Sequence, residues 1–159
     1  MIKIKLVIFQ QALTESGKFA SRHLLLGNGF SIASIPSIFT YTSLYDRADF
    51  SEIPEAKFLF EKLETKDFEL VIKSLENASV ALSIYLDGHK NVAQKMREDA
   101  IKLKELLIRT VAQNHPAFPS EIEENKYLHC INFLKNFMDY KGKVYTFNYD
   151  LLLYWTVMY

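Results

Sequence analysis

The sequence predicts an α/β fold rich in helix, in which a small parallel sheet carries a large helical insertion over about residues 50–140. Two short apolar runs, RHLLLG at 22–27 and KVYTFN at 143–148, have the length and residue types of buried strands. Between them, apolar residues recur at three- and four-residue steps, which predicts helices. There is no internal repeat or Gly/Ser-rich linker, so a single domain over 1–159 is expected.

Composition limits the compartment and the partners. A chain of 159 residues is long enough to bury a core, and its 19 Lys and Arg balance 19 Asp and Glu. Without a basic excess, nucleic acid is not expected as a partner. The single cysteine excludes an internal disulfide, and no apolar stretch reaches the ~18–20 residues of a membrane span. We therefore expect a cytoplasmic protein with no membrane partner.

Helices are predicted before the first strand and within the insertion, over 6–20, 68–86, 91–113 and 120–139. Thr65 or Asp67 is available to cap the start of the second helix. Pro116 ends the third. The capping-box pattern Ser120-x-x-Glu123 predicts where the fourth helix begins.

The first strand ends in the turn Gly27-Asn28-Gly29, which is followed by Phe30 and Ser31. Because glycine has no Cβ, backbone N–H groups in such a turn can approach a phosphate closely, and a following helix N-terminus favours negative charge. The same residues also suit a tight turn with no ligand. The turn alone leaves both interpretations open.

The second strand ends in TFNYD at 146–150, which carries Thr146, Asn148 and Asp150. In a parallel sheet the carboxyl ends of both strands lie at the same edge, where ligands of open α/β sheets bind. We therefore expect these polar residues and the glycine turn to converge on one crevice.

These two motifs resemble those of the sirtuin-like NAD-binding superfamily. Sirtuins carry a Gly-Ala-Gly turn with a downstream serine, and then a Thr-Gln-Asn-Ile-Asp strand end; here LLLGNGFS is followed by YTFNYDLLLYW. The closest resemblance is to an uncharacterised bacterial family, domain of unknown function 4917, from about residue 7 onward. The resemblance implies a Rossmann-like, sirtuin-like partial domain with NAD as substrate or ligand.

The resemblance also implies roles for individual residues. The implied NAD-binding positions are Gly27, Asn28, Gly29, Phe30, Ser31, Thr146, Asn148 and Asp150. Asn148 would lie beside the nicotinamide ribose, where related NAD-cleaving defence proteins use an asparagine in catalysis. Asp150 would bind the nicotinamide carboxamide or hold the loop. The implied activity is that of an NAD hydrolase (NAD glycohydrolase) in bacterial anti-phage defence.

The sequence departs from the sirtuin pattern in two respects. Sirtuins use a histidine downstream of the Asn-x-Asp motif, but only nine residues follow Asp150 and none is histidine. We therefore expect the chain to correspond to such a domain without its C-terminal half. The sirtuin zinc module needs four cysteines and only Cys130 exists, so neither a metal site nor protein deacylation is expected.

Other reactive or aromatic residues are expected to be structural. This expectation covers the four histidines, His23, His89, His115 and His129. His129 and Cys130 are adjacent on a predicted helix, so they should point in different directions and not form a nucleophilic pair. Phe39, Tyr41 and Tyr45 follow the glycine turn. They could stack on a base or pack in the core, and spacing does not separate the two.

Three functions follow from the sequence. The first is the NAD-hydrolysing or NAD-sensing domain. The second is a module that binds NAD or ADP-ribose without catalysis, and the third is a helical protein-interaction domain in which the turn is only structural. The C-terminal run LLLYWTVMY at 151–159 is expected to form a helix behind the Asn-Tyr-Asp loop. If its apolar side is uncovered, a homo-oligomer or a partner chain is expected to cover it.

Overall fold

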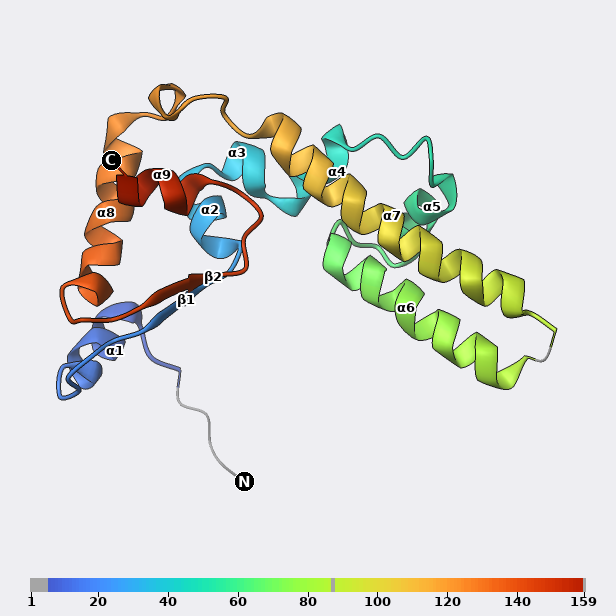
Figure 1. Ribbon diagram of the computed structural model, residues 1–159, viewed down its shortest axis with the longest axis horizontal. Helices are drawn as coiled ribbons and strands as arrows, with labels where there is room; N and C mark the ends of the chain where they lie inside the picture. The colour runs from blue at the N-terminus through green and yellow to red at the C-terminus, as the bar shows by residue number, and fades with distance from the viewer. Residues whose placement is uncertain (1–5, 87, 159) are drawn as a thin grey trace. The chain divides into compact units, whose positions relative to one another are not determined.

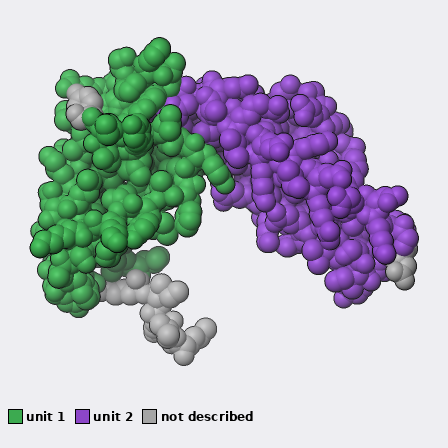
Figure 2. All heavy atoms as spheres, in the orientation of Figure 1, with its two compact units in different colours: residues 1–34, 116–159 green, residues 35–115 purple. Residues whose placement is uncertain are grey.

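The computed structural model describes residues 6–86 and 88–158 and shows a predominantly helical chain with a two-stranded parallel sheet among those residues (Figure 1). The chain forms two compact units (Figure 2). Unit 1 combines the residues up to Ser34 with those from Pro116 onward, and unit 2 spans Ile35–His115. Unit 2 is thus inserted in sequence between the two strands. The expected helix-rich chain with a small parallel sheet is confirmed.

Unit 1 holds both strands. Its elements are α1 (Phe9–Ser16), β1 (Leu24–Leu26), α2 (Gly29–Ser34), the 3₁₀ helix η1 (Pro119–Glu121), α8 (Glu124–Met138), β2 (Val144–Thr146) and α9 (Leu152–Met158). The strands pair in parallel, with Leu24 opposite Val144 and Leu26 opposite Thr146. Beyond the last pair, the Phe147 amide donates to the Leu26 carbonyl at 3.1 Å. The predicted strands are confirmed, although each is shorter than expected.

Arg22 connects the start of β1 to two helices of unit 1. Its guanidinium donates to the carbonyl of Leu13 at 3.2 Å and to that of Asn136 at 3.4 Å. The same group lies 3.9 Å from the centre of the Tyr140 ring, a cation–π contact. One side chain thereby joins α1, β1 and the C-terminal end of α8.

The capping-box prediction for α8 is wrong. Ser120 lies in η1, and α8 begins at Glu124 with Glu123 as N-cap and no side-chain capping bond. Pro119 explains the difference, because its fixed φ starts a separate 3₁₀ turn, closed by the Ile122 amide donating to the Pro119 carbonyl at 3.1 Å. That turn takes up the serine before the helix starts.

The C-terminal run forms a helix, α9, as expected; Tyr159 lies outside the described residues. Leu152 and Thr156 are buried on one side. Tyr154, Val157 and Met158 are exposed on the other. An apolar face of unit 1 is therefore open.

Unit 2 is entirely helical in the described residues. Its elements are α3 (Pro36–Phe39), α4 (Tyr41–Arg47), α5 (Pro54–Lys62), α6 (Phe68–Tyr85) and α7 (Lys90–Asn114). The long helices α6 and α7 lie side by side as a hairpin (Figure 1). Asp67 caps α6 by accepting from the amides of Glu69 at 2.9 Å and Leu70 at 3.1 Å. Both predicted helices and the cap are confirmed. The segment predicted as one insertion is divided, because α8 packs in unit 1.

An aromatic cluster forms the core of unit 2. The Phe60 ring centre lies 5.0 Å from that of Phe68, 5.1 Å from Tyr45 and 5.6 Å from Phe50. Phe39 is buried and meets the His115 ring edge-on at 5.9 Å. The aromatic residues that follow the glycine turn therefore pack in a core. Within the described residues, no helix combines the length and apolar character needed to span a bilayer.

Candidate functional site

The glycine turn follows β1 directly. Gly27 and Asn28 lie between the strand and α2, which begins at Gly29. The Phe30 amide donates to the Gly27 carbonyl at 3.1 Å, and the Ile32 amide donates to the Asn28 carbonyl at 2.9 Å. These two amides are used by the turn itself, so a ligand at this edge would be held mainly by other groups.

The two glycines of the turn border open space. A Cβ built on Gly27 or Gly29 meets no atom within 4 Å, and neither residue has a left-handed backbone. The fold therefore needs glycine at these positions neither for packing nor for conformation. A side chain here would instead occupy space beside the strand ends, which is the space that a ligand approaching the backbone requires.

A hydrogen-bonded cluster joins α2 to the end of β2. The Ser31 hydroxyl donates to Asp150 Oδ2 at 2.6 Å, and Asn148 Nδ2 donates to Ser31 Oγ at 2.9 Å. The backbone amide of Asn148 donates to Thr146 Oγ1 at 3.0 Å, and the backbone amide of Leu152 donates to Asp150 Oδ1 at 2.9 Å. Ser31 is 0% exposed. The structure thus brings together the serine after the turn and the polar residues of the second strand end.

The direction of these bonds leaves one acceptor unused. An ionised carboxylate only accepts, so Ser31 must give its proton to Asp150 and can only accept from Asn148. Asn148 must therefore turn its NH₂ group toward Ser31, which directs Oδ1 elsewhere. Asn148 Oδ1 is buried and has no hydrogen-bond partner among the described residues. A buried acceptor without a partner costs about 1–3 kcal/mol, so it is a suitable contact for a ligand that brings a donor.

Sequence reasoning offered two roles for Asp150, binding the nicotinamide carboxamide or holding the loop. Asp150 Oδ1 accepts from the backbone amide of Leu152, two residues on, which is the second role. An aspartate just before a helix is the usual signal for an Asx turn, in which the side chain accepts from the backbone amide two residues on. The hydrogen bonds that Ser31 makes with Asp150 and Asn148 were not predicted. Among the histidines, His23 accepts from the Lys143 amide at 3.1 Å through Nδ1, a structural contact between the two strand starts.

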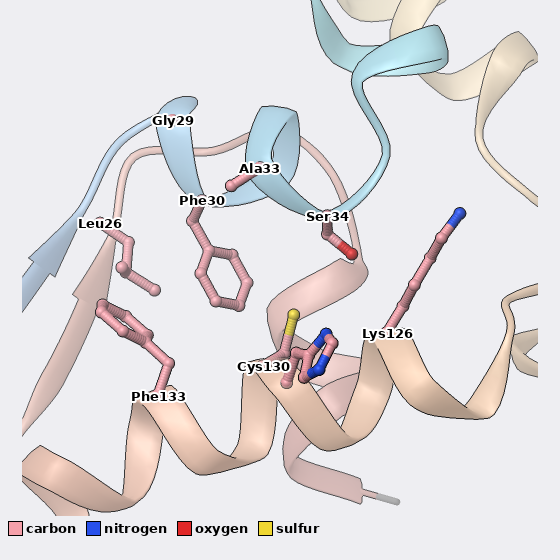
Figure 3. A pocket seen from close by; sticks show the side chains of 9 residues that line it. Leu26, Gly29, Phe30, Ala33, Ser34, Lys126, Cys130 and Phe133 are labelled. Atoms are coloured by element: carbon pink, nitrogen blue, oxygen red, sulfur yellow. The ribbon is translucent and has the colours of Figure 1, made fainter.

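A separate cavity of about 390 Å³ lies in unit 1 between α2 and α8 (Figure 3). Its lining residues are Leu26, Gly29, Phe30, Ala33, Ser34, Lys126, His129, Cys130 and Phe133. His129 and Cys130 both line this cavity. Neighbours on a helix are about 100° apart, so lining one cavity is compatible with the expected difference in direction, which stays a prediction.

Cys130 is nevertheless a poor nucleophile. Burial raises the pKa of its thiol, and the nearby hydroxyls of Ser34 and Thr156 offset only part of that rise. Because the thiolate is the reactive form, the thiol at neutral pH is largely inert.

Alkylation kinetics test this environment. At about pH 8, we expect iodoacetamide to modify Cys130 roughly tenfold or more slowly in the native chain than in the urea-unfolded chain. As pH rises, the unfolded rate should level off first, because the native pKa is higher. Equal rates at every pH would contradict the buried, protonated thiol. Cys130→Ser is the control for labelling elsewhere.

Within residues 6–86 and 88–158, no three His, Cys, Asp or Glu side chains lie close enough together to hold a metal ion.

The observations define a helix-rich α/β protein with a polar cluster at the carboxyl edge of two parallel strands. The sequence pattern of the domain of unknown function DUF4917 matches residues 24–159, and the chain belongs to this family. The match contains both strands and the whole cluster but begins after α1, later than the expected residue 7. No curated protein and no solved structure matches the chain.

Proposed function

We propose that the chain is a sirtuin-like NAD-binding protein that holds NAD or a related nucleotide at the carboxyl edge of β1 and β2. The observation that carries this proposal is the buried, unpartnered Oδ1 of Asn148, held in place through Ser31 and Asp150. Such an acceptor needs a ligand with hydroxyl or amide donors. NAD offers both, in its ribose hydroxyls and its carboxamide.

The residues of the cluster fit a division of roles. Asn148 is the primary contact with the ligand. Ser31 positions the side-chain amide of Asn148 and does not touch the ligand itself, because the serine is fully buried. Gly27 and Gly29 leave room for the nucleotide beside the backbone. Thr146 holds the loop by accepting a hydrogen bond from the backbone amide of Asn148. Asn28 and Phe30 remain proposed contacts at the same turn.

The proposal extends from NAD binding to NAD hydrolysis. NAD would supply a labile bond between nicotinamide and ribose. The Asn148 acceptor would orient a ribose hydroxyl beside that bond, and Asp150 would keep the asparagine in position through Ser31. Nicotinamide release from NAD separates an NAD hydrolase of the anti-phage type from a module that only binds.

Calorimetric titration with NAD and ADP-ribose tests binding. Wild-type chain should bind, and Asn148→Ala should weaken the affinity roughly tenfold or more, because a desolvated hydrogen bond is lost. Asn132→Ala, on the exposed side of α8, is the matched control and should bind as wild type. Equal binding by wild type and Asn148→Ala, or no binding by wild type, would rule the proposal out.

The space beside the turn is tested at Gly29. Gly29→Glu should abolish binding by bulk and by repulsion of the phosphates, whereas Gly29→Lys keeps the bulk and reverses the charge. If neither change weakens NAD binding, the nucleotide does not lie against the turn.

The expected partner chain or homo-oligomer stays a prediction. The exposed apolar side chains of Tyr154, Val157 and Met158 on α9 support it.

A further inference from the structure

The cavity in unit 1 is built from two facing helix surfaces. Phe30, Ala33 and Ser34 recur at three- and four-residue steps on α2, which places them on one face. Lys126, Cys130 and Phe133 do the same on α8. Ser31 does not line the cavity, and neither do its hydrogen-bond partners Asn148 and Asp150. The cavity is therefore separate from the proposed nucleotide site, although both border Gly29 and Phe30.

The two ends of the cavity differ in chemistry (Figure 3). Leu26, Phe30 and Phe133 gather at one end. The centres of the two phenylalanine rings are 6.2 Å apart and the rings are tilted by 38°, so they contact each other as one wall. A ligand would lie against this apolar wall rather than between the rings.

The other end presents hydrogen-bond donors. Lys126 forms no ion pair with any residue that the structure describes. Within the same residues, Ser34 Oγ is buried and meets the distance and angle limits of a hydrogen bond with no partner; the Cys130 thiol beside it is a weak one. No aspartate or glutamate is among the residues that line the cavity. An ammonium group and a hydroxyl that lies beside only a weakly hydrogen-bonding thiol, with no carboxylate among the lining residues, favour an anionic group.

We propose that this cavity binds a small carboxylate with an apolar body. The carboxylate accepts from Lys126 and Ser34, and the body packs on Phe30 and Phe133. The volume of about 390 Å³ lies within the range of small-molecule pockets. A single cation at the polar end matches the single charge of a carboxylate. This site adds a second ligand to the protein, and it does not depend on NAD binding.

Titration of the whole chain with octanoate, octylamine and 1-octanol tests the polarity of the site, because the three share one apolar body. Octanoate should bind, and octylamine should bind at least tenfold more weakly. Lys126→Met keeps an unbranched side chain one atom shorter and removes the charge. It should weaken octanoate about tenfold and leave octanol unchanged. Octylamine binding as tightly as octanoate, or no octanoate binding at all, would overturn the proposal.

Filling the cavity tests its location. Ala33 is exposed on α2 and lines the cavity, so Ala33→Phe should fill it without disturbing the core and should abolish octanoate binding. Ala33→Ser, checked for an unchanged thermal midpoint together with Ala33→Phe, should bind as wild type. Retained binding in Ala33→Phe would place the ligand elsewhere and overturn the proposal. Lys126→Met should keep wild-type NAD binding, which separates failure here from failure of the nucleotide site.

Discussion

Replacement of Gly142 by alanine is expected to unfold unit 1. A Cβ at this position would lie 1.6 Å from the Arg22 carbonyl oxygen, 2.7 Å from its carbonyl carbon and 2.7 Å from the Phe137 oxygen. All three are backbone atoms, so no side chain can turn aside to relieve the contact. The strands must separate from the end of α8 or the turn must be rebuilt. We expect a loss of about 3–5 kcal/mol, a large part of the stability of a small protein.

Urea unfolding followed by tryptophan fluorescence measures this loss directly, because the single tryptophan, Trp155, is in α9 of unit 1. Gly27→Ala is the matched control. Its new methyl group would enter open space, so its unfolding free energy should change by only about 0.5 kcal/mol. An unchanged unfolding midpoint for Gly142→Ala would contradict the close approach of residues 22 and 142.

Phe60→Ala is expected to cause a loss of similar size in unit 2. Phe60 is 1% exposed and contacts Phe68, Tyr45 and Phe50 through its ring. Removing the ring would leave a cavity at the centre of these aromatic side chains and cost about 3–5 kcal/mol. Far-UV circular dichroism follows the unfolding, since α6 and α7 give much of the helical signal.

Phe58→Ala is the matched control for this change. Phe58 lies on the same helix, α5, and is 64% exposed, so its loss should change the free energy of unfolding by no more than about 0.5 kcal/mol. Equal destabilisation by the two substitutions would show that α5 does not insert Phe60 into the core as described.

The long elements of the fold are predictable because their patterns are long. Apolar residues at helical spacing locate α6 and α7 to within two residues. Asp67, as a capping residue, marks the start of α6. The two strands are only three residues each, yet both were located by their apolar runs. Their parallel pairing follows from the helices between them.

The short elements could not be predicted in the same way. Helices α2 to α5 have four to nine residues, which is too short for a spacing pattern to repeat. The available signals were Pro36 and Pro54, each at the first position of a helix. The start of α8 was misplaced because a serine and a glutamate at the right spacing do not show that a proline turn has already taken the serine.

The candidate site also has a part that can be predicted from the sequence and a part that cannot. Parallel strands place Asn148 and Asp150 beside the glycine turn, and this much follows from the sequence. The buried position of Ser31 and the unused Oδ1 depend on how the hydrogen bonds are ordered. No spacing of residues encodes that order.

The insertion of unit 2 between β1 and β2 also has a consequence for synthesis on the ribosome. Leu24–Leu26 leaves the exit tunnel early, but its partner Val144–Thr146 emerges only after the whole of unit 2. Unit 2 is one continuous segment with a helical hairpin, so it can fold while the nascent chain is still growing. Until β2 emerges, the edge of β1 is unpaired and can pair with other chains. We therefore expect unit 1, with the polar cluster and the cavity, to form only after unit 2.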